Sequence, residues 1–244
     1  MVTSEYVNWI RRAELETVIP LLPPSAKVLE IGGGTGEQAL QLSRLGFDVT
    51  AIDLPSSNYS TARVFPIIEY DGQRIPFPDG TFDVVFSSNT LEHVRDLKRM
   101  HAEIRRVLAP TGFCLHIVPT GAWQFWSIIS AFPSAGRELI QARSLRDVYL
   151  GLRHLARAAI PPRHGERGFG LLEIWLFRPA WWRRNFRKNN FVVEADAPVG
   201  LFYTGNGFFG SSWPISKRRR LAPRLGSACH IFKLRPQPGQ QAPK

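Results

Sequence analysis

The stretch Val28-Leu29-Glu30-Ile31-Gly32-Gly33-Gly34-Thr35-Gly36 decides the fold of this chain. Its apolar first half is typical of a buried strand, and its glycines predict a tight turn that leads into a helix. Because glycine lacks a Cβ, it adopts positive φ easily and lets a ligand approach the backbone. The order of strand, turn and helix therefore predicts a nucleotide-binding turn that includes Gly32, Gly33, Gly34 and Gly36.

The charges around this turn narrow the choice of ligand. A dinucleotide-binding fingerprint would place its third glycine at position 37, where this chain has Glu37. Glu30 precedes the turn, and two carboxylates at close range disfavour a diphosphate. They suit a ligand with an ammonium or sulfonium group. S-adenosylmethionine carries both groups and no phosphate, so it is the expected cofactor.

A second acidic residue supports this expectation. Asp53 closes an apolar run that begins at position 48 and reads as the second strand. In doubly wound folds, a carboxylate at this place accepts hydrogen bonds from the ribose hydroxyls. The turn and the carboxylate together are a stronger signal than either alone.

The chain resembles class I S-adenosylmethionine-dependent methyltransferases of the group related to small-molecule enzymes such as those of the ubiquinone pathway. The resemblance covers residues from about 20 to 120. One departure is that Asp71-Gly72-Gln73 stands where the family usually has Asp-Ala-Glu, which affects the neighbourhood of the adenine. The matching segments are 28–36, Ile52-Asp53, Asp71-Gly72, 75–83, 87–94 and 108–112.

The resemblance implies a set of cofactor-binding residues. Glu30 and the glycines are expected at the methionine and ribose, and Asp53 at the ribose hydroxyls. Asp71 is expected at the adenine edge and Asn89 under the sulfonium. The other cofactor-binding residues expected are Leu54, Gly72 and Ser88.

The alternation of short apolar runs with helical segments predicts an α/β fold with a doubly wound, mostly parallel, seven-stranded sheet. This is the Rossmann-like class I methyltransferase fold, with a helical insertion after the fifth strand. Ligands bind such sheets at the carboxyl ends of the strands. The expected strands are 27–31, 48–53, 65–70, 82–87, 112–118, 191–195 and 227–233, and the expected helices are 37–45, 96–108 and 179–189.

The chain is long enough to bury a full core as one domain. We expect residues 1–120 to form its cofactor-binding part and 179–234 to complete the same sheet. Residues 121–178 exceed an ordinary loop and are expected to form a helical lid or substrate wall. The Pro/Gln-rich residues 235–244 are expected to be a disordered tail.

Charge is distributed unevenly along the chain. Residues 1–120 carry a net charge of −3, whereas residues 121–244 carry +14, which together give the chain's +11. A cationic half of this kind attracts anionic partners such as nucleic acid, acidic lipid or a phosphorylated metabolite.

The cysteines and the N-terminus indicate the compartment. Cys114 and Cys229 read as buried small hydrophobic residues, without a disulfide framework. The start of the chain lacks the apolar core of a signal peptide, and no run reaches the ~20 apolar residues of a membrane-spanning helix. We therefore expect a cytoplasmic protein that contacts the inner face of the membrane peripherally.

Three residues are candidates for catalysis. Transfer of a methyl group to oxygen needs a base, and His93, just after the fourth strand, is the leading one. The alternative is that Glu92-His93 caps the next helix. His164 and Glu166 follow a Pro-Pro break and either act as base and substrate clamp or are merely solvated. The two His-x-Glu triplets lack the Pro-Cys-x-x-Cys of zinc deaminases, so no metal is expected.

Two further residues near these candidates have structural alternatives. His116 reads as a hydrogen-bonded interior histidine in the middle of the fifth strand. Glu173 stands alone in an apolar run, which suggests a partnered carboxylate that faces a pocket.

Aromatic and basic residues gather after residue 120. Trp123–Phe132 and Trp181-Trp182 suggest a membrane-interfacial surface, stacking of bases or sugars, or packing of the lid. The run 217–220 reads as a solvated cationic segment that could touch phosphate. This region also resembles, more loosely, methyltransferases of bacterial cell-surface polysaccharide biosynthesis, through 116–126, His164-Gly165-Glu166, 202–205 and 225–227.

The sequence thus predicts an enzyme that methylates an anionic small-molecule, glycan or lipid-linked acceptor at oxygen. Nucleic acid is a less favoured partner, because no RNA-binding module accompanies the basic residues. Two alternatives stay open. One is an RNA methyltransferase that uses the cationic half, and the other is a non-catalytic subunit that kept the fold.

Overall fold

The computed structural model describes residues 4–238, which divide into two compact units. Among the described residues, the sheet unit comprises Asn8–Val118, Arg183–Ala197 and 231–238. The helical unit comprises 4–7, Pro119–Trp182 and Pro198–His230.

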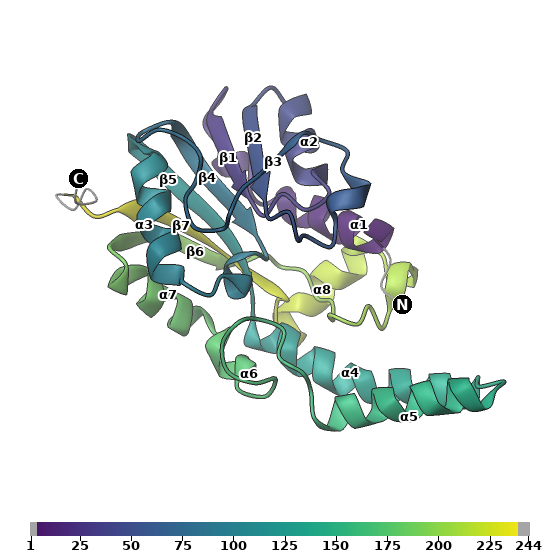
Figure 1. Cartoon of the computed structure of the whole chain (residues 1–244). Helices are drawn as coiled ribbons and strands as arrows, with labels where there is room; N and C mark the ends of the chain where they lie inside the picture. The colour runs from purple at the N-terminus through teal and green to yellow at the C-terminus, as the bar shows by residue number, and fades with distance from the viewer. Residues whose placement is uncertain (1–3, 239–244) are drawn as a thin grey trace. The chain divides into compact units, whose positions relative to one another are not determined.

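Seven strands form one sheet in the order β3-β2-β1-β4-β5-β7-β6 (Figure 1). Strands β1 to β5 pair in parallel. The predicted doubly wound sheet is therefore confirmed. The strands are β1 (Lys27–Ile31), β2 (Asp48–Asp53), β3 (Ile67–Glu69), β4 (Phe82–Ser88), β5 (Leu108–Pro119), β6 (Phe191–Pro198) and β7 (Cys229–Pro236).

The last strand, β7, runs antiparallel to its neighbours. The amide of Gln237, just after β7, donates to the carbonyl of Asn190, just before β6, at 3.0 Å. At the other end, the amide of Val199, just after β6, donates to the carbonyl of Cys229 at 3.0 Å. The end of one strand thus lies beside the start of the other, which makes the sheet mixed.

Among the described helices, two were not predicted from the sequence. Helices α1 and α8 were missed, whereas α2, α3 and α7 match the expected segments and α4 to α6 form the insertion. The helices are α1 (Ser4–Leu15), α2 (Glu37–Arg44), α3 (Leu97–Val107), α4 (Gly121–Ile140), α5 (Leu145–Ala159), α6 (Glu173–Leu176), α7 (Pro179–Lys188) and α8 (Ile215–Leu225), with short 3-10 turns η1 (Ile19–Leu21), η2 (Ser60–Ala62), η3 (Leu91–His93) and η4 (Gly210–Ser212).

The central strands form the core of the sheet unit. Val28, Leu29, Val84 and Val85 are fully buried, as expected for parallel strands covered on both faces. Ile31 pairs with Ile52 on β2 and with Ser87 on β4. This register brings the carboxyl ends of neighbouring strands to one edge of the sheet, where the candidate site lies.

Several strand boundaries differ from the prediction, since β3 is shorter and β6 longer than expected. Strand β5 begins at Leu108 rather than at residue 112, because Phe82 pairs with Leu108 and Val84 with Phe113, with an irregularity in the register between them. Strand β7 extends to Pro236, two residues into the segment predicted to be disordered. The rest of that prediction, residues 239–244, lies outside the described residues. Within residues 4–238, no helix is long and apolar enough to cross a bilayer.

Candidate functional site

The glycine turn after β1 has the conformation that its sequence predicts. Gly32 and Gly36 adopt φ of 77° and 80°, a region that side chains with a Cβ rarely enter. A Cβ at Gly32 would lie 2.3 Å from Oγ1 of Thr90, and one at Gly36 would lie 2.7 Å from Cβ of Phe65. Positive φ and close packing against the protein's own atoms thus exclude larger residues at these two positions.

Asp53 links the end of β2 to this turn. Its Oδ2 accepts a hydrogen bond from the amide of Gly34 at 2.9 Å, and its Oδ1 accepts one from the amide of Leu54 at 2.8 Å. Each carboxylate oxygen can accept more than one hydrogen bond. The carboxylate is therefore fixed by the backbone and keeps capacity for hydroxyl groups of a ligand.

The residues after β2 and β3 meet at the same edge. A Cβ at Gly72 would lie 2.8 Å from Cδ2 of Leu54, so these two predicted residues are neighbours. Tyr70, which the sequence analysis missed, lies here too. Burial and the charges of Asp53 and Asp71 raise the pKa of Tyr70 to about 12, which keeps its hydroxyl protonated.

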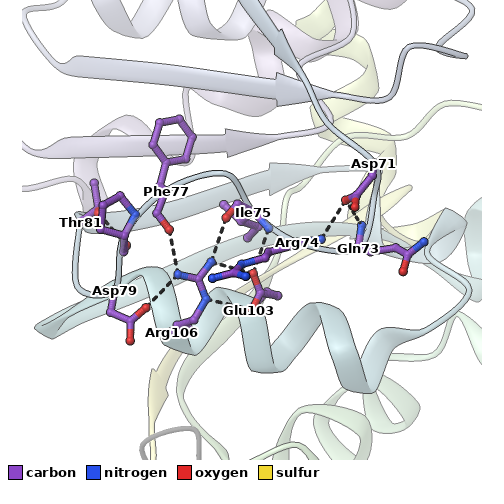
Figure 2. Close-up of polar contacts among 10 residues, drawn as sticks. Asp71, Gln73, Arg74, Ile75, Phe77, Asp79, Thr81, Glu103 and Arg106 are labelled. Atoms are coloured by element: carbon purple, nitrogen blue, oxygen red, sulfur yellow. Dashed lines mark hydrogen bonds and ion pairs between the residues drawn. The ribbon is translucent and has the colours of Figure 1, made fainter. Parts of the chain in front are cut away.

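Asp71 organises a turn of its own (Figure 2). Its Oδ1 accepts hydrogen bonds from the amides of Gln73 and Arg74 at 2.8 and 2.9 Å. These bonds, together with the charge of Arg99, lower the pKa of the Asp71 carboxyl. The carboxylate therefore stays ionised at the carboxyl end of β3.

Arg106 of α3 fastens the segment that follows Asp71, and the sequence analysis missed it. Its guanidinium donates to the carbonyls of Ile75 and Phe77, each at 2.8 Å, and to the carboxylate of Asp79 at 2.9 Å (Figure 2). It also binds Glu103 on its own helix through two bonds of 2.9 and 2.7 Å. In the sequence, the only sign of this anchoring role is that Glu103 and Arg106 have opposite charges and are three residues apart on a predicted helix.

Glu30 lies in the interior, with only 1% of its surface exposed. Burial, followed by the charge of Asp53, raises the pKa of Glu30 to about 8. Its Oε2 is buried without a hydrogen-bond partner among the described residues. A buried carboxyl oxygen without a partner is a place that a donor group of a ligand can satisfy.

The end of β4 supplies the remaining predicted residues. Asn89 has a φ of 50°, a conformation that asparagine tolerates better than most residues, and its amide donates to the carbonyl of Ile117 at 2.8 Å. Its side-chain amide donates to Oγ of Ser88 at 3.2 Å. The structure thus brings all predicted cofactor-binding residues to the carboxyl ends of β1 to β4, although their contact with a cofactor stays a prediction.

His93 ends the short helix η3 and is exposed, with its Nε2 3.7 Å from Oε1 of the buried Glu92. The suggested capping role is wrong, because Asp96 caps α3 by accepting a hydrogen bond from the amide of Arg99 at 3.0 Å. The role of His93 as a base stays a prediction.

His164 and Glu166 belong to the helical unit. The buried carboxylate of Glu173 accepts from the amide of His164 at 2.8 Å, from the amide of Gly165 at 2.6 Å and from Nε2 of Gln124 at 3.1 Å. Burial raises the pKa of Glu173, although these amides oppose the shift. Glu173 is thus partnered, as expected, but by the loop that it supports. The catalytic roles of His164 and Glu166 stay predictions.

His116 and the two cysteines are interior residues, as predicted. Nδ1 of His116 lies 2.8 Å from Oγ of Ser87, and burial lowers the pKa of this histidine to about 3. Cys114 and Cys229 are both fully buried and free.

Most of the aromatic clusters pack the helical unit. Trp123 is buried and its ring lies 4.6 Å from that of His164, while Trp182 is fully buried. The basic run 217–220 is not uniformly solvated, which corrects the prediction. Arg218 is buried and donates to the carbonyl of Trp213 at 2.9 Å and to that of Gly210. It therefore holds the loop before α8 rather than an external phosphate.

An open cavity of about 550 Å³ lies within the helical unit. Phe125, Trp126 and Leu225 are among its apolar walls, and Arg178 and Arg224 are exposed at it. No carboxylate lines it, and neither arginine forms an ion pair within residues 4–238. The full lining is Thr120, Gly121, Ala122, Phe125, Trp126, Ile174, Arg178, Pro179, Pro198, Arg224, Leu225, Ser227 and His230.

Two of the loosely matching segments, 116–126 and 225–227, contribute residues to this cavity. Oγ1 of Thr120 donates to the carbonyl of Ser227 at 2.6 Å, and Nε1 of Trp126 donates to the carbonyl of Leu225 at 2.8 Å. A third segment, 202–205, contacts this wall, because the rings of Trp126 and Phe202 lie 5.8 Å apart, edge to face. The fourth, 164–166, is not part of the lining.

Residues 29–116 match the protein family described as "Methyltransferase domain". The chain is 33% identical over 112 residues to the ubiquinone/menaquinone biosynthesis C-methyltransferase UbiE of Ralstonia pickettii, a match that covers 41% of this chain and 46% of that enzyme. It is 27% identical over 157 residues to the malonyl-[acyl-carrier protein] O-methyltransferase of Geobacter sulfurreducens, covering 57% of this chain and 59% of that enzyme. The chain thus spans about half the length of these curated relatives.

Solved structures show the same fold. An S-adenosylmethionine-dependent methyltransferase from Mesorhizobium loti superposes with a TM-score of 0.55 at 16% identity, covering 91% of this chain and 97% of that one. A methyltransferase from Aquifex aeolicus gives a TM-score of 0.53, also at 16% identity, covering 91% of each chain. The sequence and structure matches confirm the expected resemblance and the fold class.

Proposed function

We propose that this chain, which has the fold of class I S-adenosylmethionine-dependent methyltransferases, binds S-adenosylmethionine and methylates an anionic, lipid-linked acceptor at oxygen. The observation that carries the cofactor assignment is Asp53, whose carboxylate is fixed by the amide of Gly34 in the glycine turn. The family match over residues 29–116 supports the same cofactor.

The residues at the carboxyl ends of the strands fit this cofactor. Asp53 would hold the ribose hydroxyls, and Asp71 and Gly72 would border the adenine. The partnerless Oε2 of Glu30 would accept a hydrogen bond from a cationic ligand. A diphosphate would meet three carboxyl groups here, Glu30, Asp53 and Asp71, and would be repelled by the ionised ones.

When bound, S-adenosylmethionine supplies an electrophilic methyl group on a good leaving group. The protein then has to orient the acceptor, exclude water and remove the hydroxyl proton. We propose that the imidazole of His93 removes this hydroxyl proton. An imidazole nitrogen can take up a proton from a hydroxyl group and release it to water.

The cavity of the helical unit supports an anionic acceptor with an apolar part. Arg178 and Arg224 offer guanidinium groups, which match phosphate and carboxylate oxygens, and the aromatic walls suit a hydrocarbon or isoprenoid chain. The relatives include a C-methyltransferase and an O-methyltransferase, so oxygen as the accepting atom belongs to the proposal.

Isothermal titration with S-adenosylhomocysteine tests the cofactor assignment, and we expect binding that NAD does not compete for. Incubation with methyl-labelled cofactor and a cell extract tests the acceptor, with the label fractionated into lipid, glycan, protein and RNA pools. We expect label in the lipid pool. Label in RNA that disappears steeply with salt would instead support the RNA methyltransferase alternative.

A small-molecule binding experiment tests the cavity separately from methyl transfer. Dodecyl phosphate, used below its micelle concentration, should bind at least about 10-fold more tightly than inorganic phosphate or octyl glucoside. The double variant Arg178→Gln/Arg224→Gln should lose this preference, while Arg220→Gln on α8 keeps it. Equal binding of the three probes would remove the cavity as the acceptor site.

A further inference from the structure

Helices α4 and α5 form an antiparallel hairpin within the helical unit (Figure 1). Small residues allow the two helices to pack closely, because Ala135, Gly151 and Ala158 are buried. A Cβ at Gly151 would lie 2.6 Å from Cδ2 of Leu139. The inner face of α5 is therefore taken up by α4, and its larger apolar side chains point elsewhere.

These larger side chains form an exposed stripe along α5. Leu145, Val148, Tyr149, Leu152 and Leu155 follow a spacing of three and four residues, which places them on one side of a helix. Their exposed fractions are 90, 40, 63, 53 and 37%. A contiguous apolar surface of this kind marks an interaction site rather than a water-facing surface.

A second stripe, of arginines, runs beside the apolar one. Arg146, Arg153 and Arg157 recur at spacings of seven and four and share one side of α5. None of the three forms an ion pair with a carboxylate of residues 4–238. The two carboxylates of the hairpin are engaged elsewhere, since Glu138 binds Nδ1 of His154 at 2.5 Å and Asp147 accepts from the amide of Arg143 at 3.1 Å.

We propose that these two stripes of α5, which lie within residues 145–157, dock the protein on an anionic lipid bilayer. A helix with an apolar side and an adjacent cationic side lies in the plane of the interface, with the apolar side among the acyl chains and the cations at the headgroups. The helix has 15 residues, a length of about 22 Å, and no described helix of the chain is suited to crossing the bilayer.

Charge favours a bilayer over a second copy of this chain as the partner of these stripes. Residues 121–160 carry five arginines and two carboxylates. Two copies paired through the same stripe would bring these positive charges together, whereas an anionic surface neutralises them. The docking proposal does not depend on methyl transfer, because it concerns the surface of the helical unit alone.

Vesicle flotation tests the proposal directly. We expect the full chain to bind vesicles of phosphatidylcholine with 30% phosphatidylglycerol at least about 10-fold more strongly than pure phosphatidylcholine, and to be released at 0.5 M salt. Leu145→Gln/Leu152→Gln and Arg146→Gln/Arg153→Gln/Arg157→Gln should each weaken binding about 10- to 100-fold. The matched control, Arg44→Gln/Lys98→Gln/Arg187→Gln, removes the same charge from the sheet unit and should bind normally.

Sedimentation velocity and cofactor titration complete the experiment. A dimer that Leu145→Gln/Leu152→Gln dissociates, without selective binding to anionic vesicles, would overturn the proposal in favour of self-association. Equal binding by the hairpin variants and the control would overturn it as well. S-adenosylhomocysteine affinity should be unchanged in the hairpin variants, so failure of docking and failure of the proposed function give different results.

Discussion

Several charged side chains are used differently in the two units. In the sheet unit, Arg106 satisfies its guanidinium with two carbonyls and two carboxylates, and Asp53 is bound by two backbone amides. In the helical unit, Arg178 and Arg224 line a cavity without carboxylates, and the arginines of α5 lie beside exposed apolar residues. We therefore propose that the sheet unit is preorganised around a small ligand, whereas the helical unit presents surfaces to an external anionic partner.

The most severe test removes the carboxylate that we propose holds the cofactor. Asp53→Ala should lower the affinity for S-adenosylhomocysteine at least about 100-fold, because a hydrogen bond to a charged group contributes about 1.5–3 kcal/mol and two ribose hydroxyls would lose theirs. Isothermal titration measures this change. Asp48→Asn, at the opposite end of the same strand, is the control. Unchanged affinity in Asp53→Ala would remove this residue from the site.

The second test attacks the preorganisation of the sheet unit. Arg106→Gln should lower the free energy of unfolding by about 2–4 kcal/mol, because several partners lose a charged donor at once. It should also weaken cofactor binding, since the loop that follows Asp71 loses its anchor. Chemical denaturation and titration measure both effects. Arg12→Gln, which breaks the exposed pair with Glu37, should cost less than about 1 kcal/mol.

The third test separates structural from accessible cations within the helical unit. Arg218→Gln should destabilise the chain by about 2–3 kcal/mol, because buried carbonyls lose their donor. Arg220→Gln, which is exposed on the same helix, should leave the melting temperature nearly unchanged. Similar melting temperatures for the two variants would mean that Arg218 is not the internal brace that its contacts indicate.

The fourth test uses pH. The pKa of Glu30 is raised from 4.5 to about 8 in the folded chain, so its contribution to stability is complete below pH 4.5 and is lost as the pH rises through 8. His116, whose pKa is lowered to about 3, acts in the opposite direction and only below about pH 6.5. Between pH 6.5 and 8, stability should therefore fall by up to about 1.4 kcal/mol per pH unit. In Glu30→Gln this slope should be flatter, and equal slopes would contradict the burial of an uncharged Glu30.

The sequence predicted the sheet well because local patterns determine it. Val28–Gly36 carries its own strand and turn signals, and the segment ending at Asp53 does so too. Arg106 could not be predicted as an anchor, because its partners Ile75, Phe77 and Asp79 are far from it in sequence and two of them act through backbone carbonyls.

Within the helical unit, the sequence predicted a helical insertion over 121–178 but missed α8. Only the structure shows that the large apolar side chains of α5, in this insertion, stay exposed. The run 217–220 looked uniformly polar. Arg218 is nevertheless buried, because the carbonyls that receive it come from the preceding loop, which composition does not reveal.

The carboxylate of Glu173 has a consequence for local opening of the chain. The amides of His164 and Gly165 lie in a connection without regular structure, where exchange with solvent would ordinarily be fast. Both donate to the carboxylate of one buried residue, so withdrawal of that carboxylate would expose both amides to exchange with deuterium. The two amides should therefore share a single protection factor, and the turn carrying His164 would be set in place before any partner arrives.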